Sequence, residues 1–438
     1  MSASSAEPPQ KKFNRAFYLR IAAVLAVLAA ILPVALPILR GSGNAGGSEI
    51  AFLRNSEVYT IQPNGSGLYQ VTGKIALGFS WSPDHHEMLV RFAGAALPIT
   101  TIDPIAQLQA DTYATLGIVS IDGGALLGIT AFGSIPYRSD GWWDATGNRL
   151  IYREGASTLI LSQPDQPGGI ASKLITNTGG IPAIASNAQA IAFVNPNGVL
   201  LAGQAQQTLQ TIQTGAATTL PGGLPARVLW RPGHQELLYV TKTAQPNQYA
   251  FTLTHLTGPA IPLAAVTRPQ RYAFSPNGSQ LLIQTAAGYE ILPLHKDAAD
   301  QPIIISLPIS QFSDPWWSPN SAAIIIRTTN ALYYINSATG AARIVATLPV
   351  IPSQTTDAAP IPIPDDPWNA DGSAFVFASA GGIWADGQAL AVTSQPGTGL
   401  YVAHTAALNT PPALIDWGEH GAISWSTPDP NTEFDTIG

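Results

Sequence analysis

The sequence contains no cysteine, which excludes disulfide bridges and a lipid-modified cysteine anchor. Only 11% of its 438 residues are charged, so Gln, Thr, Ser, Asn and Pro must solvate much of the surface. Several enzyme motifs are also missing: there is no Gly-x-Ser-x-Gly elbow, P-loop, dinucleotide-binding glycine pattern or haem-binding cysteine pair. We therefore expect no cofactor, and no hydrolase of the α/β type.

Positive charge is scarce outside the first forty residues. These forty residues hold five of the twenty Lys and Arg and one of the twenty-seven Asp and Glu. The rest of the chain holds 15 Lys and Arg against 26 Asp and Glu, a net charge of −11. Binding to nucleic acid needs clustered cations that displace counterions, so nucleic acid is not an expected partner.

The N-terminal segment has the pattern of a membrane anchor. Residues 1–20 contain Lys11, Lys12, Arg15 and Arg20, and the apolar run 21–39 contains no charge. This run is near the minimum length of a membrane-spanning helix, and the preceding positive charge predicts a cytoplasmic N-terminus. We expect a cytoplasmic basic segment (1–20), a transmembrane signal-anchor helix (21–39) and a Gly/Ser-rich linker (40–49). The protein would be a single-pass protein of the cell membrane with its main domain extracytoplasmic.

A cleaved signal peptide is the alternative interpretation of this segment. Pro33 and Pro37 could break the helix, and small residues follow the apolar run. No clean small-x-small cleavage site follows the run directly, and Arg40 ends it. The length of the run and Arg40 favour an anchor that is retained.

A short phrase that recurs along the chain predicts a repeat architecture. It reads Trp-Ser-Pro-Asp at 81–84, Phe-Ser-Pro-Asn-Gly at 274–278 and Trp-Ser-Pro-Asn at 317–320. Looser copies begin at other aromatic residues, and a degenerate copy begins at Ile184. The shortest spacings between copies match the roughly 40 to 45 residues of a four-stranded propeller blade. The predicted structural anchors are Trp81, Trp143, Trp230, Phe274, Trp317, Trp368 and Trp425.

The phrase has the chemistry of a tight turn between two strands. Pro presets φ at the first central position, Asp or Asn tolerates the next position, and Gly supplies a positive φ. A short apolar run follows each turn, such as 280–283 and 323–326. The anchor aromatic at the end of the first strand should be buried between neighbouring blades, and the adjacent pair Trp316 and Trp317 should point to opposite faces.

This pattern resembles the WD40-like family of β-propeller repeats typified by TolB, also called PD40 repeats, whose units carry an aromatic-Ser-Pro-Asp-Gly turn before an apolar strand. The resemblance extends from Ile50 to about Trp425. It implies a fold and says little about function, because propellers host many unrelated activities.

The two ends of the repeat region predict how the ring closes. Three strands precede the first anchor strand, and the last anchor strand, 422–425, has no strands after it. Joining the two ends completes one blade and protects sheet edges. The expected fold is all-β: a single propeller at 50–427 with eight four-stranded blades, or seven if the Ile184 unit is lost, and a C-terminal tail at 428–438.

Local histidine and acidic motifs have ordinary structural explanations. His85, His86 and Glu87 are consecutive, so their side chains project to opposite sides of a strand and converge poorly on a metal. His255 and His420 have no partner nearby in the sequence. Asp84, Asp371 and Asp429 lie in repeat turns, where Asp is favoured. No metal site is predicted.

Extra length beyond a compact blade predicts a binding surface; the alternative is that Pro-rich stretches such as 359–364 are stiff extended covers over the ring. Insertions fall at 93–111 and 382–399, after second strands, and at 349–367, after a fourth strand, so all three should leave the same face. A binding or interaction module with a protein partner at or near the membrane is the expected function. The candidate contacts on this face are Asp103, Asp111, Asp365, Asp366, Trp384 and Asp386.

The alternative function is an enzyme that acts on a glycan or peptide with its active site in the central channel. Such an enzyme needs acidic or histidine groups that converge within hydrogen-bond reach, and no acid–base pair can be named from the sequence. The first strand of each unit would face the channel. The candidate channel-lining residues are Ser80, Asp140, Arg227, Arg271 and Asp314.

Overall fold

The strands of the computed structural model lie between Glu49 and Trp425. The structure describes these residues except 74, 83–84, 94–113, 122–126, 129–140, 144–149, 155–157, 164–169, 177–182, 186–189, 205–208, 222–225, 257, 295–300, 306, 308–313, 329, 348–365, 380–382, 385–397, 419 and 421. All described residues belong to one unit, Gly46–Gly438. They contain no α-helix, and a 3-10 turn lies at Thr405–Ala407. No described helix is long and apolar enough to cross a membrane; the predicted anchor 21–39 lies outside the described residues.

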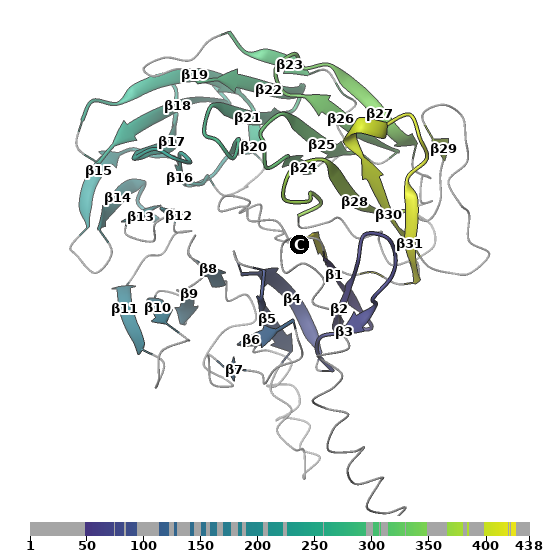
Figure 1. Ribbon diagram of the computed structural model, residues 1–438. Coiled ribbons are helices and arrows are strands. Elements are labelled where there is room, and N and C mark those ends of the chain that lie inside the picture. Colours follow the sequence, from purple (N-terminus) through teal and green to yellow (C-terminus); the bar gives the residue numbers. More distant parts are fainter. Residues whose placement is uncertain are drawn as a thin grey trace, which may run out of the picture. The chain divides into compact units, whose positions relative to one another are not determined.

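The described strands follow one another along the chain as Figure 1 labels them. The first half contains β1 (Ile50–Arg54), β2 (Glu57–Ile61), β3 (Tyr69–Gln70), β4 (Ala76–Trp81), β5 (Glu87–Ala93), β6 (Ala114–Ser120), β7 (Leu127–Gly128), β8 (Gly141–Trp143), β9 (Leu150–Glu154), β10 (Thr158–Gln163), β11 (Ile170–Thr176), β12 (Ala183–Ile184), β13 (Ala190–Val194), β14 (Val199–Gln204) and β15 (Gln210–Thr214). The second half contains β16 (Leu229–Trp230), β17 (Glu236–Lys242), β18 (Gln248–His255), β19 (Ile261–Thr267), β20 (Pro269–Phe274), β21 (Gln280–Thr285), β22 (Gly288–Pro293), β23 (Ile303–Ile305), β24 (Asp314–Trp317), β25 (Ala323–Arg327), β26 (Ala331–Asn336), β27 (Ala342–Thr347), β28 (Ala374–Ser379), β29 (Ile383–Trp384), β30 (Thr398–His404), β31 (Ala413–Gly418) and β32 (Ile423–Trp425).

These strands form eight antiparallel sheets, which we number in chain order. Sheet 1 contains β32 and β1–β3, and sheets 2 to 6 contain β4–β7, β8–β11, β12–β15, β16–β19 and β20–β23. Sheet 7 contains β24–β27 and β29, and sheet 8 contains β28, β30 and β31. Within each of sheets 2 to 6, successive strands are neighbours, as expected for an up-and-down sheet.

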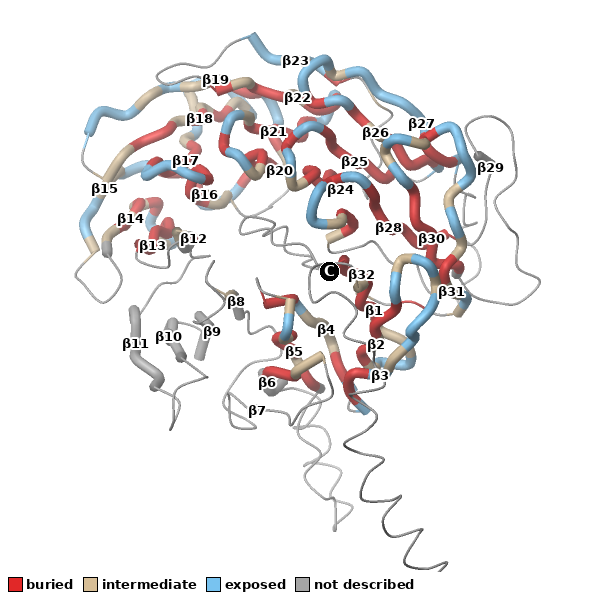
Figure 2. Tube along the Cα trace, in the orientation of Figure 1, coloured by how far each residue is buried: buried red, intermediate tan, exposed pale blue. Residues whose placement is uncertain are grey.

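The predicted joining of the two ends of the repeat region is confirmed. β32 pairs with β1 in an antiparallel ladder, with Trp425 opposite Ile50 and Ile423 opposite Phe52 (Figure 2). Sheet 1 therefore takes one strand from the end of the described chain and three from its start. This pairing covers an edge of β1 that would otherwise expose unpaired backbone groups.

The apolar core consists of separate clusters, each between two sheets that follow one another. Clusters join sheets 1 and 2, 4 and 5, 5 and 6, 6 and 7, and 7 and 8, and another joins sheet 8 back to sheet 1. The strand β25 shows the reason, since Ile324 and Ile326 face sheet 6 while Ile325 faces sheet 8. Alternate side chains of one strand thus enter two clusters, and β21 and β25 are buried over most of their length (Figure 2).

The anchor aromatics lie in these clusters, as predicted. Trp81, Trp230, Phe274, Trp317, Trp368 and Trp425 are all buried, and Trp316 and Trp317 belong to different clusters on opposite sides of sheet 7. Trp143 is the exception, because it is only half-buried.

Three anchor indoles also bond the backbone of the first strand in the preceding sheet. The indole N–H groups of Trp230, Trp368 and Trp81 donate to the carbonyls of Ala183 (3.1 Å), Trp316 (3.1 Å) and Ser424 (3.4 Å). Each of these anchors therefore combines burial of a large ring with a hydrogen bond across the junction.

The turns that follow the first strands contact one another from sheet to sheet. In sheet 6, the Ser275 hydroxyl donates to Asn277 Oδ1 (2.8 Å) and accepts from the backbone N–H of Gln280 (3.0 Å). In the next two sheets, the Asn320 amide donates to the carbonyl of Asp371 (3.0 Å). These turns lie at one end of the strands. We call this end of the sheets the turn edge, and we call the opposite end of the strands the insertion edge.

Candidate functional site

Two of the six predicted binding-face residues lie in the described part of the chain. Asp366 is half-buried, its carbonyl accepts from the backbone N–H of Trp425 (2.7 Å), and its carboxylate accepts from that of Trp368 (3.3 Å). Asp366 thus links sheet 8 to β32. Trp384 lies on β29. Asp103, Asp111, Asp365 and Asp386 lie outside the described residues.

The insertion 382–399 contributes a strand to a neighbouring sheet, which sequence reasoning did not predict. Its β29 pairs with β27, with Trp384 opposite Ala346 and Ile383 opposite Thr347 (Figure 1). Sheet 7 consequently has five strands, because β29 covers the outer edge that β27 would otherwise leave open. Thr347 is also the last described residue before the insertion 349–367, so these two insertions start side by side.

Two predicted channel-lining residues lie near the start of neighbouring first strands. Arg227 and Arg271 each lie three residues before an anchor, and both are half-buried. The hydroxyl of Tyr272 accepts from the backbone N–H of Arg227 (2.7 Å) and donates to its carbonyl. Burial lowers the pKa of Arg271, the nearby Tyr289 hydroxyl acts to raise it, and the positive charge of Arg227 lowers it again.

The other predicted channel residues are more dispersed. Ser80 lies on β4 and is exposed, and Asp140 lies outside the described residues. Asp314 begins β24 and is the cross-strand partner of Arg327 on β25. Arg327 is 8% exposed, and burial lowers its pKa to about 10. Sequence reasoning missed Arg327, because an arginine at the end of an apolar strand resembles a solvent-exposed boundary residue.

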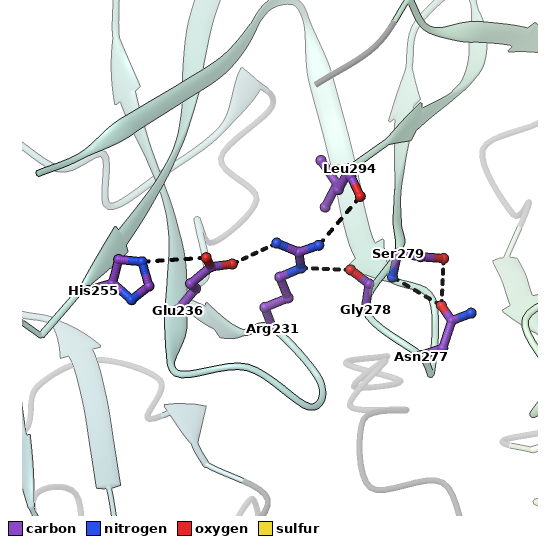
Figure 3. Close-up of polar contacts among 7 residues, drawn as sticks. All are labelled: Arg231, Glu236, His255, Asn277, Gly278, Ser279 and Leu294. Carbon is purple, nitrogen blue, oxygen red and sulfur yellow. Dashed lines mark hydrogen bonds and ion pairs between the residues drawn. The ribbon is translucent and has the colours of Figure 1, made fainter. Parts of the chain in front are cut away.

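A buried ion pair lies in sheet 5 at the turn edge, and its arginine also bonds sheet 6 (Figure 3). Arg231 Nη1 lies 2.7 Å from Glu236 Oε2, and the two residues are only 4% and 5% exposed. The Arg231 guanidinium also donates through Nε to the carbonyl of Gly278 (2.7 Å) and through Nη2 to that of Leu294 (3.5 Å). His255 Nε2 lies 3.5 Å from the other Glu236 oxygen.

This ion pair was not predicted, although the repeat contained a signal for it. Arg231 occupies the position of the turn serine in the other copies, such as Ser275 and Ser318. A long cation at a position that elsewhere holds a small hydroxyl indicates a bond to another element. His255 was interpreted as lacking a partner nearby in the sequence, and its partner Glu236 belongs to the paired strand β17.

A second charged cluster lies between sheets 8 and 1. The Asp416 carboxylate bonds the Arg54 guanidinium and shares a hydrogen bond with His420 Nε2 (2.9 Å), and the His420 ring stacks edge-on against Phe52 with centroids 5.0 Å apart. Burial acts to raise the pKa of Asp416, but bonds from His420 and Arg54 outweigh it and hold that pKa below its ordinary value. Among the described residues, no group of three His, Cys, Asp or Glu side chains could hold a metal ion.

Comparisons with known proteins show no family for this chain. No protein-family model matches the chain, and no curated protein matches it. An oligogalacturonate lyase from Vibrio parahaemolyticus is similar in structure (TM-score 0.44, 9% identity), with 82% of this chain and 98% of that chain covered. AztD from Citrobacter koseri has a TM-score of 0.41 and 12% identity over 68% of this chain and 93% of that chain.

A eukaryotic initiation factor is also similar, with a TM-score of 0.48 and 10% identity over 86% of this chain and 98% of that chain. The lyase and AztD have propeller-type folds. All three TM-scores are below 0.5, so none of these likenesses indicates what this chain binds. The chain is an all-β protein of antiparallel sheets with propeller-like neighbours, and the finer resemblance to TolB-type repeats stays a prediction.

Proposed function

We propose that the chain is a membrane-anchored β-propeller of eight blades that binds a protein partner or other ligand through the insertions 93–111, 349–367 and 382–399. The eight sheets would be the blades, and the β1–β32 pairing would close the ring. Six core clusters between successive sheets support this architecture, including the cluster that joins sheet 8 to sheet 1. In this proposal the propeller comprises residues 50–427.

The observation that carries the proposal is the pairing of β29 with β27. It brings the insertion 382–399 next to the start of the insertion 349–367 through the Ile383–Thr347 pair. Long segments in an otherwise economical repeat are commonly functional, and two that start side by side can form one surface.

Contacts between turns at the turn edge support a common face for the three insertions at the opposite edge. Turns after the first strands of sheets 5, 6, 7 and 8 contact each other, as in the Arg231–Gly278 and Asn320–Asp371 bonds. Strands of an antiparallel sheet alternate in direction, so connections from second to third strands and into first strands leave the other edge. The insertion 93–111 is such a connection, between β5 and β6.

The membrane assignment completes the proposal. The basic segment 1–20, the apolar run 21–39 and the linker 40–49 would hold the propeller outside the membrane, and residues 428–438 would form a short tail. A tethered propeller that presents its insertion face is suited to capture a partner at or near the membrane.

Quantitative partner binding tests the proposal. The intact protein is isolated from its native membrane, and bound proteins are identified by mass spectrometry and then titrated against the purified chain. In one variant a Gly/Ser linker replaces 94–111; in the control a linker replaces 164–168, which connects β10 to β11 at the turn edge. A partner whose affinity falls at least tenfold only in the first variant supports the proposal.

Two results would count against this function. Equal affinity of both variants for the partner would exclude the insertion face as the binding surface. Recovery of no partner by any form, together with turnover of a glycan or peptide, would favour the alternative of an enzyme whose active site lies in the channel.

A further inference from the structure

Arg91 is a half-buried arginine that forms no ion pair with any residue that the structure describes. Its Nε is buried, and no described group accepts a hydrogen bond from it. Residues 41–438 contain 26 Asp and Glu against 15 Lys and Arg, so carboxylates are plentiful in this domain. Because a charge is costly to remove from water, a buried arginine is normally paired. The unpaired Arg91 therefore indicates a place for an anion that the described residues do not supply.

The guanidinium of Arg91 lies against a glycine of the first strand of sheet 2. On β5, Val90 and Phe92 enter the cluster between sheets 1 and 2, so Arg91 projects from the face turned away from sheet 1. Gly78 on β4 is its cross-strand partner and shares that face. A Cβ at Gly78 would lie 3.6 Å from Arg91 Nη2, so the arginine reaches from the second strand across to the first.

Gly78 occupies a position that holds a charged residue in other copies of the repeat. It lies three residues before the anchor Trp81, and the residues three before the next anchors along the chain include Asp140, Arg227, Arg271 and Asp314. In sheet 7 this row holds an acid opposite an arginine, because Asp314 is the cross-strand partner of Arg327. In sheet 2 the arginine is present and a glycine stands in place of the acid. The missing group of this row is a carboxylate.

Ser80 adds a hydroxyl on the same face of sheet 2. It lies two residues after Gly78 on β4, and alternate residues of a strand share one face. Ser80 is exposed, so its hydroxyl is available to a ligand. β5 ends at Ala93, two residues after Arg91, where the insertion 93–111 begins. The arginine, the open glycine position and the hydroxyl therefore lie beside the start of this insertion.

The geometry of Arg91 favours a carboxylate as the ligand. The Nε–H and Nη2–H of a guanidinium point in the same direction and match the two oxygens of a carboxylate in a two-bond fork. In Arg91 the first of these groups is unbonded and the second lies beside Gly78. One arginine neutralises one negative charge, so a carboxylate leaves no net charge in this half-buried place, whereas a dianionic phosphate would leave one.

We propose that Arg91 binds the carboxylate of a ligand over Gly78 and that the Ser80 hydroxyl donates a hydrogen bond to it. This carboxylate belongs either to an acidic side chain of the protein partner or to a free small acid. The site lies at the start of the insertion 93–111, so the inference deepens the proposed function and rests on it for the role of that insertion.

Ligand-observed NMR of the full-length protein in a nonionic detergent tests the site, with acetate as the probe and sodium chloride keeping ionic strength constant. Saturation transferred from the protein to the acetate methyl group reports weak binding. We expect saturable acetate binding, at least tenfold weaker in Arg91→Gln and at least threefold weaker in Ser80→Ala. The matched control is Arg268→Gln, which removes an exposed arginine of the insertion edge and should leave affinity unchanged. Absence of saturable acetate binding, or equal weakening by Arg268→Gln, would overturn the proposal.

Two substitutions at Gly78 separate binding from folding. Gly78→Ala should not lower the melting temperature, because the added Cβ makes an ordinary contact with Arg91, but it fills the place of the carboxylate and should weaken acetate binding at least threefold. Gly78→Asp places an acid opposite Arg91, as Asp314 lies opposite Arg327. This variant should lose acetate binding and gain melting temperature. Unchanged acetate binding by Gly78→Asp would contradict the site.

Partner binding identifies the source of the carboxylate. If an acidic side chain of the partner supplies it, Arg91→Gln should weaken partner binding at least tenfold; if a free acid supplies it, partner affinity should stay unchanged in this variant. Acetate binding should persist when a linker replaces 94–111, because Gly78, Ser80 and Arg91 remain, so failure of the carboxylate site and failure of the interaction face are read separately. Displacement of acetate by an equal concentration of dianionic phosphate would overturn the assignment to a carboxylate.

Discussion

The junction between sheets 5 and 6 and the junctions among sheets 6, 7 and 8 use the same turn position with different chemistry. In sheets 6 and 7 the position holds Ser275 or Ser318, whose hydroxyl bonds groups within its own turn. In sheet 5 it holds Arg231, whose guanidinium reaches the carbonyl of Gly278 in the next sheet and pairs with Glu236. Different copies of the repeat thus use either neutral hydrogen bonds or a charged pair at the same turn position.

The two solutions differ in what happens when one group is lost. The serine hydroxyl of a turn bonds groups of its own turn, and the contacts with the next sheet are neutral hydrogen bonds such as that from Asn320 to Asp371. The Arg231 junction buries a cation and an anion together, so either one alone would be a buried charge without its counterion. A charged junction is therefore specific but fragile, and a neutral junction tolerates change.

The largest effect is expected from breaking the buried ion pair. Glu236→Gln leaves the Arg231 cation buried without its anion and should lower the free energy of unfolding by about 3–5 kcal/mol. Chemical denaturation followed by tryptophan fluorescence measures it. The neutral counterpart Asn320→Ala should cost only about 1 kcal/mol. The double variant Arg231→Leu, Glu236→Leu should recover much of the loss; a loss as large as that of Glu236→Gln would contradict the comparison.

A pair of glycines separates turn conformation from contact with the next sheet. Gly278 and Gly233 occupy equivalent turns with φ of +68° and +71°. A Cβ at Gly278 would overlap the carbonyl of Pro232, whereas one at Gly233 would meet nothing within 4 Å. Gly233→Ala should cost about 1–2 kcal/mol from the left-handed backbone alone.

Gly278→Ala should cost about 1–3 kcal/mol more than Gly233→Ala, because of the overlap with the neighbouring sheet. Thermal unfolding by circular dichroism compares the two variants at equal concentration. Equal melting temperatures would mean that the turns of sheets 5 and 6 are not in contact.

Two anchor tryptophans sharpen the comparison within the neutral junctions. Trp368 and Trp317 are both buried, but only the indole of Trp368 donates to a described group, the carbonyl of Trp316. Both Phe substitutions remove a similar apolar area, and only Trp368→Phe leaves a carbonyl without its donor. Trp368→Phe should therefore cost about 1–2 kcal/mol more than Trp317→Phe in denaturant unfolding. A reversed order would show that cavity size outweighs the hydrogen bond.

The smallest effect concerns the charged junction between sheets 8 and 1, and it depends on pH. The pKa of Asp416 is held below its ordinary value, so the folded state is favoured when this carboxylate is charged. Its contribution, on the order of 1 kcal/mol, is complete above the ordinary pKa of about 3.9 and is lost as the pH falls through the lower folded value.

Unfolding measured between pH 3 and pH 7 tests the charged junction between sheets 8 and 1, with the pH window placed around the ordinary carboxyl pKa of about 3.9. Asp416→Asn should lower stability at pH 7 and flatten the acid dependence, whereas the neutral-junction variant Asn320→Ala should keep the wild-type pH profile. Parallel profiles for wild type and Asp416→Asn would remove Asp416 as a source of acid sensitivity.

Most of the fold was predictable because the same aromatic-turn phrase and apolar strand recur several times along the chain. The aromatic-Ser-Pro-Asn phrase predicted anchors that the structure buries, and the Trp316–Trp317 pair was correctly assigned to opposite faces. The half-buried Trp143 departs from this prediction. The pairing of the chain ends was predicted by counting strands, because an anchor strand without followers complements three strands without an anchor.

The candidate sites were predictable only in part. That Arg227 and Arg271 line a channel stays a prediction; the structure shows that the Tyr272 hydroxyl bonds the backbone of Arg227. The partner of His255 is Glu236 on the paired strand β17, which local sequence does not show. The interpretation that His420 lacks a partner nearby in the sequence is wrong, because its partner Asp416 lies only four residues away. The strand β29 was missed because two residues carry too little pattern to predict pairing with the edge of another sheet.

The sequence by itself determined the local rules: the turn that follows an anchor aromatic, and the alternating apolar strands buried on both faces. These follow from backbone conformation and burial of alternate side chains, which act over a few residues. Tertiary structure alone decided which charges meet, as in Arg231 with Glu236 and Asp416 with Arg54 and His420. Coulombic and hydrogen-bond partners are chosen by distance in space, and only the stacking of whole sheets sets that distance.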